Sequence, residues 1–327
     1  MAGTGYDEEA HAAQARAAMV RGMAAAGALP DPAWRAAFEA VPRHLFVPYY
    51  YVEGSGGSRR LWSGDPDPET RWRWLDGAYA DTALGTRMRD GRLISSSSQP
   101  SLMALMLAAL DVRDGDRVLE IGAGTGYNAA LLAHRLGDGR VTTVDLDPEI
   151  TESARNHLAA AGYRPLVVTG DGARGCPQRA PFDGILATCA LPSVPRAWVA
   201  QAAPGARIVA PLATGLVSLR VADTPDGRVA RGPFLATSAF FVALRGAPAA
   251  GSPEPAAGLP PHALSNDLFR FLLALSAEAL TPEEAYRLWR HERRPRRDRF
   301  GVTVTREGQW AWLDDPRGPH VWPLPEI

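Results

Sequence analysis

Three closely spaced glycines that follow a short apolar run constrain the fold more than any other feature of this sequence. The run 117–121 predicts a buried strand that ends in a tight turn. The turn contains Gly122, Gly124 and Gly126 and opens a helix, so a ligand can approach its backbone closely. A second apolar strand ends at Asp145, 23 residues after Gly122, where an acid can bond to a ribose.

Strands and helices alternate around this turn, which predicts an α/β fold with a doubly wound, mostly parallel sheet. The strands expected are 117–121, 141–144, 165–168, 184–187 and 207–210, followed by 216–222 and 234–244 as an antiparallel finish. Residues 8–26 and 32–40 predict a helical lead-in, the second helix capped by Asp31 with Pro32 at its first position.

Two segments extend the chain beyond this core, which we place in residues 1–246. Residues 53–77, rich in glycine, acidic-proline pairs and tryptophan, predict an ordered insertion. Residues 247–261 have the composition of a Pro/Ala/Gly linker. Residues 262–327 predict a small α+β accessory module, with helices over 264–279 and 282–291 and a hairpin over 301–313.

The charge balance excludes some partners. A formal net charge of −1 gives no overall attraction to nucleic acid or to anionic membranes. The run 287–299 holds seven arginines against two acids and either meets an acidic peptide or is a solvated helix end. Nucleic acid is the weaker option because the accessory module contains ten acids and ten arginines.

The remaining composition indicates a cytoplasmic enzyme without a metal. The two cysteines and seven histidines show no metal-ligand spacing. The N-terminus lacks the pattern of a secretory signal, and the apolar stretches are too short to span a bilayer. We therefore expect a protein of a reducing cytoplasm, and the oligomeric state stays open.

The spacing of the glycines distinguishes between two classes of nucleotide ligand. A nicotinamide dinucleotide site uses the pattern G-x-G-x-x-G, whereas the third glycine comes one residue earlier here. The order acid-x-Gly-x-Gly-x-Gly is typical of S-adenosylmethionine-dependent methyltransferases. The acid of this motif is Glu120, which can help to hold the methionine amino group of the cofactor. The expected cofactor-binding residues are Glu120, Gly122, Gly124, Thr125, Gly126, Asp145, Leu146, Asp171 and Gly172. Of these, Asp171 follows the third strand and either accepts the adenine amino group or forms a surface turn.

Motifs along the chain resemble the protein L-isoaspartate O-methyltransferase family in order and spacing. They are Val41-Pro42-Arg43 with Phe46-Val47-Pro48, Ala78 to Asp81, Ser98-Gln99-Pro100, Glu120 to Gly126, Gly170 to Gly172, Pro181 to Asp183 and Pro204 to Pro211. The resemblance implies that Ser98 lies beside the methyl acceptor. Since serine occupies every position from 95 to 98, Ser97 is the reserve candidate. As an alternative, Ser98 caps the helix that begins near Pro100.

The resemblance also implies the substrate, an Asp or isoAsp carboxylate in a peptide or protein. A carboxylate is ionised near neutral pH, so it needs positioning but no catalytic base. The methyl ester can then close to a succinimide, either in the repair of damaged proteins or in the tailoring of a ribosomally made peptide. The insertion and the accessory module favour tailoring. The third alternative is that the protein is not an enzyme but a peptide-binding partner of another enzyme that keeps the cofactor fold.

Overall fold

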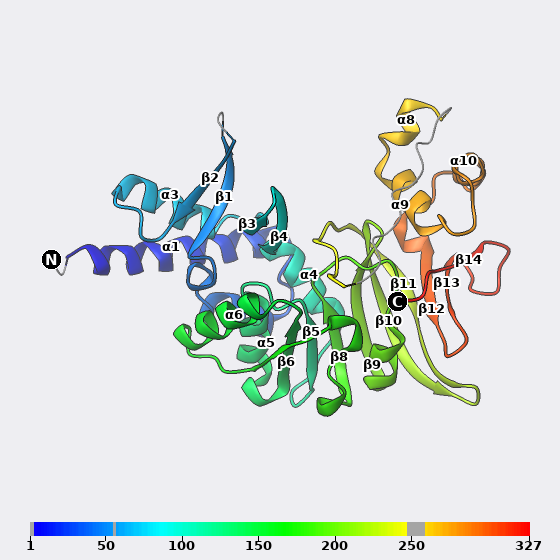
Figure 1. Cartoon of the computed structure of the whole chain (residues 1–327), viewed down its shortest axis with the longest axis horizontal. Coiled ribbons are helices and arrows are strands. Elements are labelled where there is room, and N and C mark those ends of the chain that lie inside the picture. Colours follow the sequence, from blue (N-terminus) through cyan, green and yellow to red (C-terminus); the bar gives the residue numbers. More distant parts are fainter. Residues whose placement is uncertain (1–2, 55–56, 247–258) are drawn as a thin grey trace. The chain divides into compact units, whose positions relative to one another are not determined.

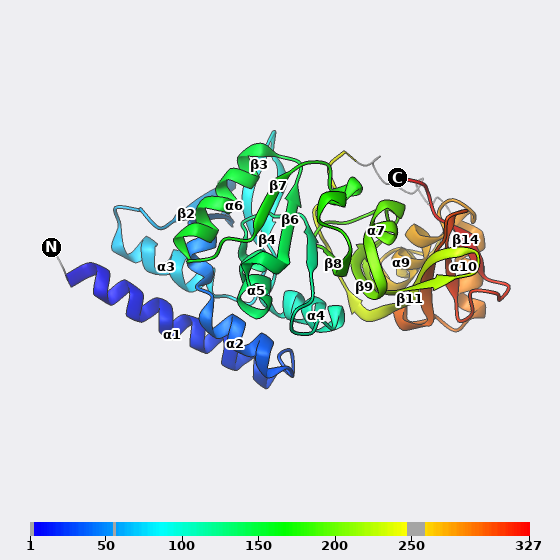
Figure 2. The same cartoon turned by 90° about the horizontal axis from the view of Figure 1, so that it is seen from below.

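The computed structural model describes residues 3–54, 57–246 and 259–327 (Figures 1 and 2). The chain forms two compact units, Met1–Gly170 and Asp171–Ile327. The linker expected over 247–261 lies outside the described residues except for 259–261. Within the described ranges, no helix has both the length and the apolar character that crossing a bilayer requires.

The first unit begins with the predicted helical lead-in. Its helices are α1 (Gly3–Ala25), α2 (Pro32–Ala40), α3 (Pro68–Ala78), α4 (Pro100–Leu110), α5 (Tyr127–Leu136) and α6 (Pro148–Ala160). The Asp31 side chain accepts a hydrogen bond from the Ala33 amide at 2.8 Å and so caps α2 as expected. Trp34 and Phe38 are buried on α2, which packs against α5.

Three parallel strands form the centre of this unit. They are β5 (Val118–Ile121), β6 (Val141–Asp145) and β7 (Leu166–Thr169), paired in the order β5-β6-β7. Every residue of β5 and β6 is buried, as expected for parallel strands covered by helices. The three ranges lie within a residue of those predicted, so the α/β core is confirmed.

The predicted insertion contributes to a second, antiparallel sheet in the same unit. Its strands are β1 (Tyr49–Gly54), β2 (Gly57–Trp62), β3 (Leu84–Arg89) and β4 (Arg92–Ser97), in the order β2-β1-β3-β4. Helix α3 follows β2 and packs against it. The buried Trp74 of α3 donates from its indole to the Val47 carbonyl at 2.9 Å, which ties the insertion to the chain before it.

The second unit starts with one parallel pair and continues antiparallel. Its strands are β8 (Phe182–Ala187), β9 (Ala202–Leu212), β10 (Gly215–Thr224), β11 (Gly227–Ser238), β12 (Phe300–Val304), β13 (Gln309–Leu313) and β14 (Val321–Pro323). Only β8 and β9 pair parallel within this unit's described residues. The strand predicted over 234–244 is wrong in its bounds, because a tight turn before Gly227 lets polar residues of β11 pair with β10.

The C-terminal segment is built into the sheet of the second unit, since β12 pairs with β11. The helices of the unit are α7 (Arg196–Gln201), α8 (Pro261–Leu264), α9 (Asp267–Leu275) and α10 (Pro282–His291). Helix α9 buries Phe269, Phe271 and Leu272 and packs against α10. The hairpin and α10 are confirmed. The helix expected over 264–279 is shorter than predicted, because α9 begins after the Asn266 cap and ends before Ser276.

Candidate active site at the glycine-rich loop

The glycine-rich turn links β5 to α5 and has a backbone that other residues rarely adopt. Gly124 has φ +51° and Gly126 has φ +87°. A Cβ at Gly126 would lie 3.2 Å from Leu158 of α6, so a side chain there would displace the helix. A Cβ at Gly124 would lie 3.5 Å from the Ser96 carbonyl, so a side chain would enter the space between the turn and β4.

Asp145 lies beside the turn, as predicted. It is buried at the end of β6, and its Oδ2 accepts a hydrogen bond from the Gly124 amide at 3.3 Å. Its Oδ1 accepts from the Asp147 amide at 3.2 Å. The following Leu146 is exposed, which leaves an apolar side chain free to cover a flat ring. The acid and the turn therefore form one polar edge at the ends of two adjacent strands.

Glu120 lies beneath the turn and is fully buried. Its Oε1 accepts a hydrogen bond from the Asn128 side chain at 2.7 Å, whereas Oε2 has no partner among the described residues. Burial raises the pKa of Glu120 to about 7, although the polar side chains of Thr143 and Asn128 act in the opposite direction. A cation bound nearby would favour the ionised carboxylate and give the orphaned oxygen a partner.

This raised pKa predicts how stability depends on pH. Between the ordinary value of 4.5 and about 7, the folded protein holds a proton that the unfolded chain releases, so stability falls as pH rises through this window. We expect Glu120 to lower the unfolding free energy of the cofactor-free enzyme by about 3 kcal/mol across it. Urea denaturation from pH 5 to 8 should show a shallower decline for Glu120→Gln than for the wild type. Equal slopes for the two proteins would contradict the assignment.

The serine run forms the end of β4 and approaches the turn at Ser95 and Ser96. Ser97 is buried as the last residue of β4, and Ser98 is half-buried between β4 and α4. The cap of α4 is Gln99 rather than Ser98, so the capping alternative is wrong. The helix begins one residue later than that alternative requires, since Pro100 fixes its first turn.

Arg43, to which the sequence assigns no role, anchors the serine segment. Its buried guanidinium donates to three carbonyl groups within 78–82, at 3.0, 2.9 and 3.1 Å. It also donates to the Ser98 carbonyl at 3.0 Å and to the Ser97 hydroxyl at 3.3 Å. Burial lowers the pKa of Arg43 to about 10, so the group is a cation at neutral pH. The Ser97 hydroxyl is thus engaged in structure.

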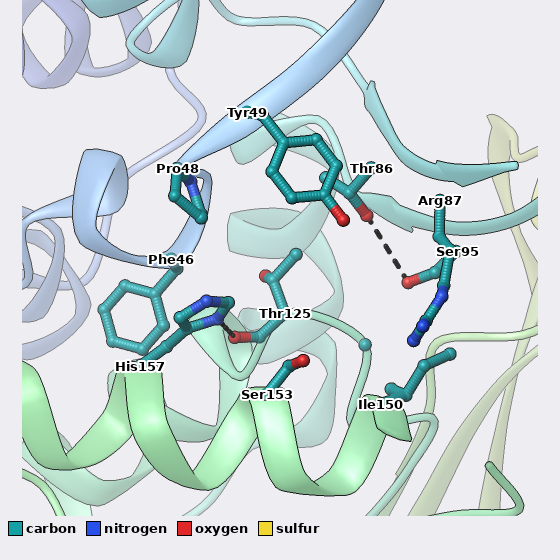
Figure 3. A pocket seen from close by; sticks show the side chains of 11 residues that line it. Phe46, Pro48, Tyr49, Thr86, Arg87, Ser95, Thr125, Ile150, Ser153 and His157 are labelled. Atoms are coloured by element: carbon teal, nitrogen blue, oxygen red, sulfur yellow. Dashed lines mark hydrogen bonds between the residues drawn. The ribbon is translucent and has the colours of Figure 1, made fainter. Parts of the chain in front are cut away.

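A pocket opens on the turn within the first unit (Figure 3). Its lining residues come from the chain before β1, from β1, β3 and β4, from the turn and from α6: Phe46, Pro48, Tyr49, Thr86, Arg87, Ser95, Gly124, Thr125, Ile150, Ser153 and His157. The Thr125 carbonyl can only accept, so His157 donates from Nδ1 at 3.0 Å and keeps Nε2 as an acceptor. Burial lowers the pKa of His157, which is therefore neutral near pH 7.

Asp171 and Gly172 belong to the second unit, whose first residue is Asp171. Asp171 caps a short 3-10 helix by accepting from the Ala173 amide at 3.0 Å, and it pairs with Arg174 at 3.6 Å. The Gly172 carbonyl accepts from the Trp198 indole at 2.8 Å. Asp171 is thus fixed in its own turn, and its contact with an adenine stays a prediction.

The site residues fit S-adenosylmethionine. Gly124 has no side chain, so the cofactor can lie against its backbone. Asp145 can accept hydrogen bonds from the ribose hydroxyls. The unpaired oxygen of Glu120 can accept a hydrogen bond from the methionine amino group. A glycine turn between parallel strands with an acid on the next strand is shared by several nucleotide-binding classes, and the closer third glycine favours a class I S-adenosylmethionine-dependent methyltransferase.

Comparisons with known proteins specify the family. The family model described as protein-L-isoaspartate(D-aspartate) O-methyltransferase matches residues 71–244, which is more than half of the chain. The protein-L-isoaspartate O-methyltransferase of Aeropyrum pernix is 38% identical over 221 residues, 66% of this chain and 74% of the relative. The second such enzyme of Archaeoglobus fulgidus is 35% identical over 213 residues, 64% of this chain and 84% of the relative. The chain belongs to this family of enzymes.

Solved structures share the fold. One described as a protein-L-isoaspartate O-methyltransferase matches with a TM-score of 0.62 and 21% identity, over 92% of this chain and all of the other. A Plasmodium falciparum protein in complex with S-adenosyl-L-homocysteine matches with a TM-score of 0.51 and 14% identity, over 70% of this chain and 97% of the other. Membership of this family decides against the nicotinamide dinucleotide and the non-catalytic alternatives.

Proposed function

We propose that this enzyme methylates the carboxylate of an isoaspartyl or aspartyl residue in a polypeptide. The proposal rests on the approach of the end of β4 to the glycine turn. The Ser96 carbonyl lies next to Gly124, and Arg43 holds the Ser98 carbonyl in place. The relatives' names give the same acceptor, an L-isoaspartyl residue of a protein.

The residues of the chain have a positioning role in this reaction. Bound S-adenosylmethionine supplies an electrophilic methyl group. The Ser98 hydroxyl would donate a hydrogen bond to the acceptor carboxylate, which is already ionised near neutral pH. No proton has to be removed, so the rate depends on alignment and on the exclusion of water.

The use of the ester follows from its chemistry. The methyl ester of isoaspartate closes to a succinimide when the next backbone nitrogen attacks the ester carbonyl and methanol leaves. Hydrolysis of the ring gives aspartate in a fraction of the molecules and isoaspartate in the rest. The names of the relatives support such a repair role, and we propose it as the main function. We also propose that the enzyme acts in the cytoplasm, as expected from the sequence.

Tailoring of a ribosomally made peptide is the second candidate, favoured by the inserted β1–β2 hairpin. The accessory segment no longer favours it. The unmatched 8% of the chain in the comparison with the solved methyltransferase amounts to about 26 residues, fewer than the 66 residues of 262–327. Part of that segment is therefore shared with a protein described as an isoaspartate methyltransferase.

Initial rates on three peptides distinguish the two uses. We expect a flexible isoaspartyl peptide to be methylated faster than its aspartyl isomer and faster than a constrained acidic peptide. Relative to the unmodified peptide, mass spectrometry would detect the methyl ester at +14 Da and the succinimide at −18 Da. Methylation of the constrained aspartyl peptide alone would replace repair by tailoring, and no methylation of any peptide would contradict the proposal.

A matched serine pair tests the positioning role. Ser98→Ala should lower kcat by about 10- to 100-fold, the effect of one lost hydrogen bond to a charged group, and leave S-adenosylhomocysteine binding nearly unchanged. Ser97→Ala should act mainly on stability, because the Ser97 hydroxyl accepts from Arg43. Steady-state kinetics and calorimetric binding provide the measurements. If Ser97→Ala alone lowered kcat, the acceptor would lie at Ser97.

A further inference from the structure

Three arginines at the end of α10 carry charge that no acid in the described part of the chain balances by an ion pair. Arg290, Arg293 and Arg294 are exposed. The two acids of this helix lie in its first turn, at the opposite end, where Glu284 closes the capping box with Thr281. We call the three residues the arginine surface.

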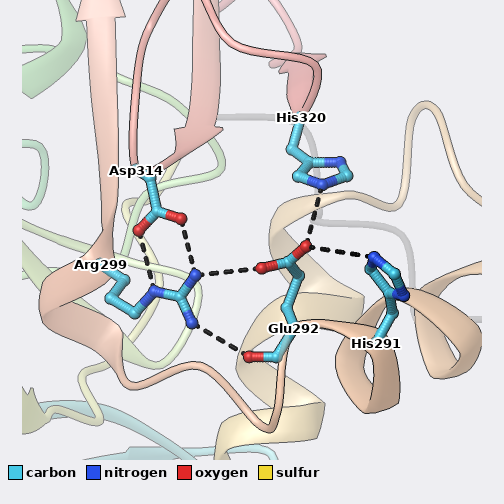
Figure 4. A network of polar contacts seen from close by, with 5 residues as sticks. All are labelled: His291, Glu292, Arg299, Asp314 and His320. Atoms are coloured by element: carbon cyan, nitrogen blue, oxygen red, sulfur yellow. Dashed lines mark hydrogen bonds and ion pairs between the residues drawn. The ribbon is translucent and has the colours of Figure 1, made fainter.

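Glu292 lies within this stretch and is also engaged elsewhere. Figure 4 shows it facing Arg299 and His320, at 3.1 and 3.3 Å. Arg299 in turn makes a two-point contact with Asp314, at 2.8 and 2.6 Å. This network fastens the end of α10 to the strands that follow, and it leaves the arginine surface without its nearest acid.

Aromatic rings hold two of the three guanidinium groups. Arg290 lies over the ring of Tyr286 at 5.9 Å, and Arg294 lies over Trp289 at 5.1 Å. A stacked guanidinium keeps its N–H edge available for a carboxylate and loses less rotamer freedom when it binds one. The surface is therefore organised before any ligand arrives.

The backbone at this position is strained in a way that favours glycine. Arg293 has φ +56° and Arg294 has φ +58°, both in the left-handed region. Helices commonly end with a glycine or an asparagine in this conformation. Two consecutive arginines form the turn with more strain, so their presence is better explained by their side chains than by the turn.

We propose that the arginine surface binds an acidic segment of the polypeptide substrate. The proposal rests on the proposed function for the statement that the substrate is a polypeptide. Three guanidinium groups at one helix end suit two or three carboxylates. The balanced charge of the chain, net −1, and of its C-terminal segment gives no overall attraction to a nucleic acid.

Direct binding tests the surface independently of methylation. The probe is a fluorescent peptide with four glutamates and no Asp or isoAsp, compared by anisotropy with its glutamine counterpart. We expect the wild type to bind the acidic peptide about tenfold more tightly and to lose this preference at high salt. Arg290→Gln, Arg293→Gln and Arg294→Gln combined should abolish the preference. The matched control replaces Arg270, Arg306 and Arg317, also exposed in the second unit, and should retain it.

A second variant separates binding from folding. Arg293→Gly with Arg294→Gly removes the strain, so Tm should rise or stay level while the acidic peptide binds more weakly. Equal binding of the two peptides by the wild type, or an equal loss in the control, would overturn the proposal. Tighter binding of a single-stranded RNA of equal charge would overturn it as well.

Kinetics link the surface to catalysis. An isoaspartyl peptide that also carries glutamates should show a KM about tenfold below that of its glutamine counterpart, with equal kcat, and only the arginine variant should lose the difference. If the wild type bound the acidic peptide but methylated no carboxylate, the proposed function would fail while the binding surface stood.

Discussion

Replacing Arg43 by lysine is expected to lower both Tm and kcat, the latter by about 100-fold, while S-adenosylhomocysteine still binds. A lysine ammonium is a compact donor that cannot reproduce the fork of the guanidinium, so part of the carbonyl set within 78–82 and at Ser98 would be left without a partner. Each buried group left unpaired costs about 1–3 kcal/mol. A displacement of the serine segment by about 1 Å is enough for the loss in kcat.

The control for this prediction is Arg35→Lys on α2. Arg35 is exposed, and among the described residues its ion pair is with Glu39, four residues along the same helix, at 3.0 Å. Surface pairs of this kind contribute about 0.3–0.5 kcal/mol, so Tm and kcat should be those of the wild type. Thermal unfolding and steady-state kinetics on an isoaspartyl peptide measure both effects. If Arg43→Lys had the kcat of the wild type, Arg43 would not position Ser98 for catalysis.

The parallel core could be predicted from the sequence because the residues that mark each of its strands and turns are adjacent in the chain. The residues of β5 and β6 are buried without exception, and valine, leucine and isoleucine mark two short runs that Glu120, Thr142 and Thr143 interrupt. The glycine turn and Asp145 follow those runs directly and could be located from spacing alone. The two come together because adjacent parallel strands end at the same edge of the sheet.

The β1–β2 hairpin was not predicted as strands, and its packing shows why. Most of β2 is exposed, including Arg59 and Arg60, so no alternation of apolar residues marks it. Its stability comes from contacts across the strands, such as Arg60 over the rings of Tyr49 and Trp62 at 5.6 and 5.5 Å. These contacts depend on the register Tyr49↔Trp62, which a sequence does not display.

Arg43 was missed as a site residue for a similar reason. Its partners lie 35 to 55 residues further along the chain, and most of its hydrogen bonds go to backbone carbonyls rather than to side chains. Every residue carries a carbonyl group, so no pattern marks the ones that are used. The choice between Ser97 and Ser98 depended on the same contact, since only the structure shows which hydroxyl accepts from Arg43.

Asp145→Ala is expected to raise the Kd for S-adenosylhomocysteine by about 10- to 100-fold, because hydrogen bonds to a charged group contribute about 1.5–3 kcal/mol. The substitution removes a ribose acceptor and also releases the Gly124 amide, so the turn itself loses support. Asp147→Asn is the matched control. Asp147 caps α6 by accepting from the Glu149 amide at 3.0 Å, a role that asparagine fills equally well.

Calorimetry on the wild type and both variants separates a role in cofactor binding from a role in folding. Asp147→Asn should bind S-adenosylhomocysteine as the wild type does, and NAD should bind to none of the three proteins. If Asp145→Ala stayed folded and bound within twofold of the wild type, the nucleoside would have to lie elsewhere than at the ends of β5 and β6. The proposed acceptor position at Ser98 would then lose its basis, since it depends on a methyl donor held where the serine strand meets the glycine turn.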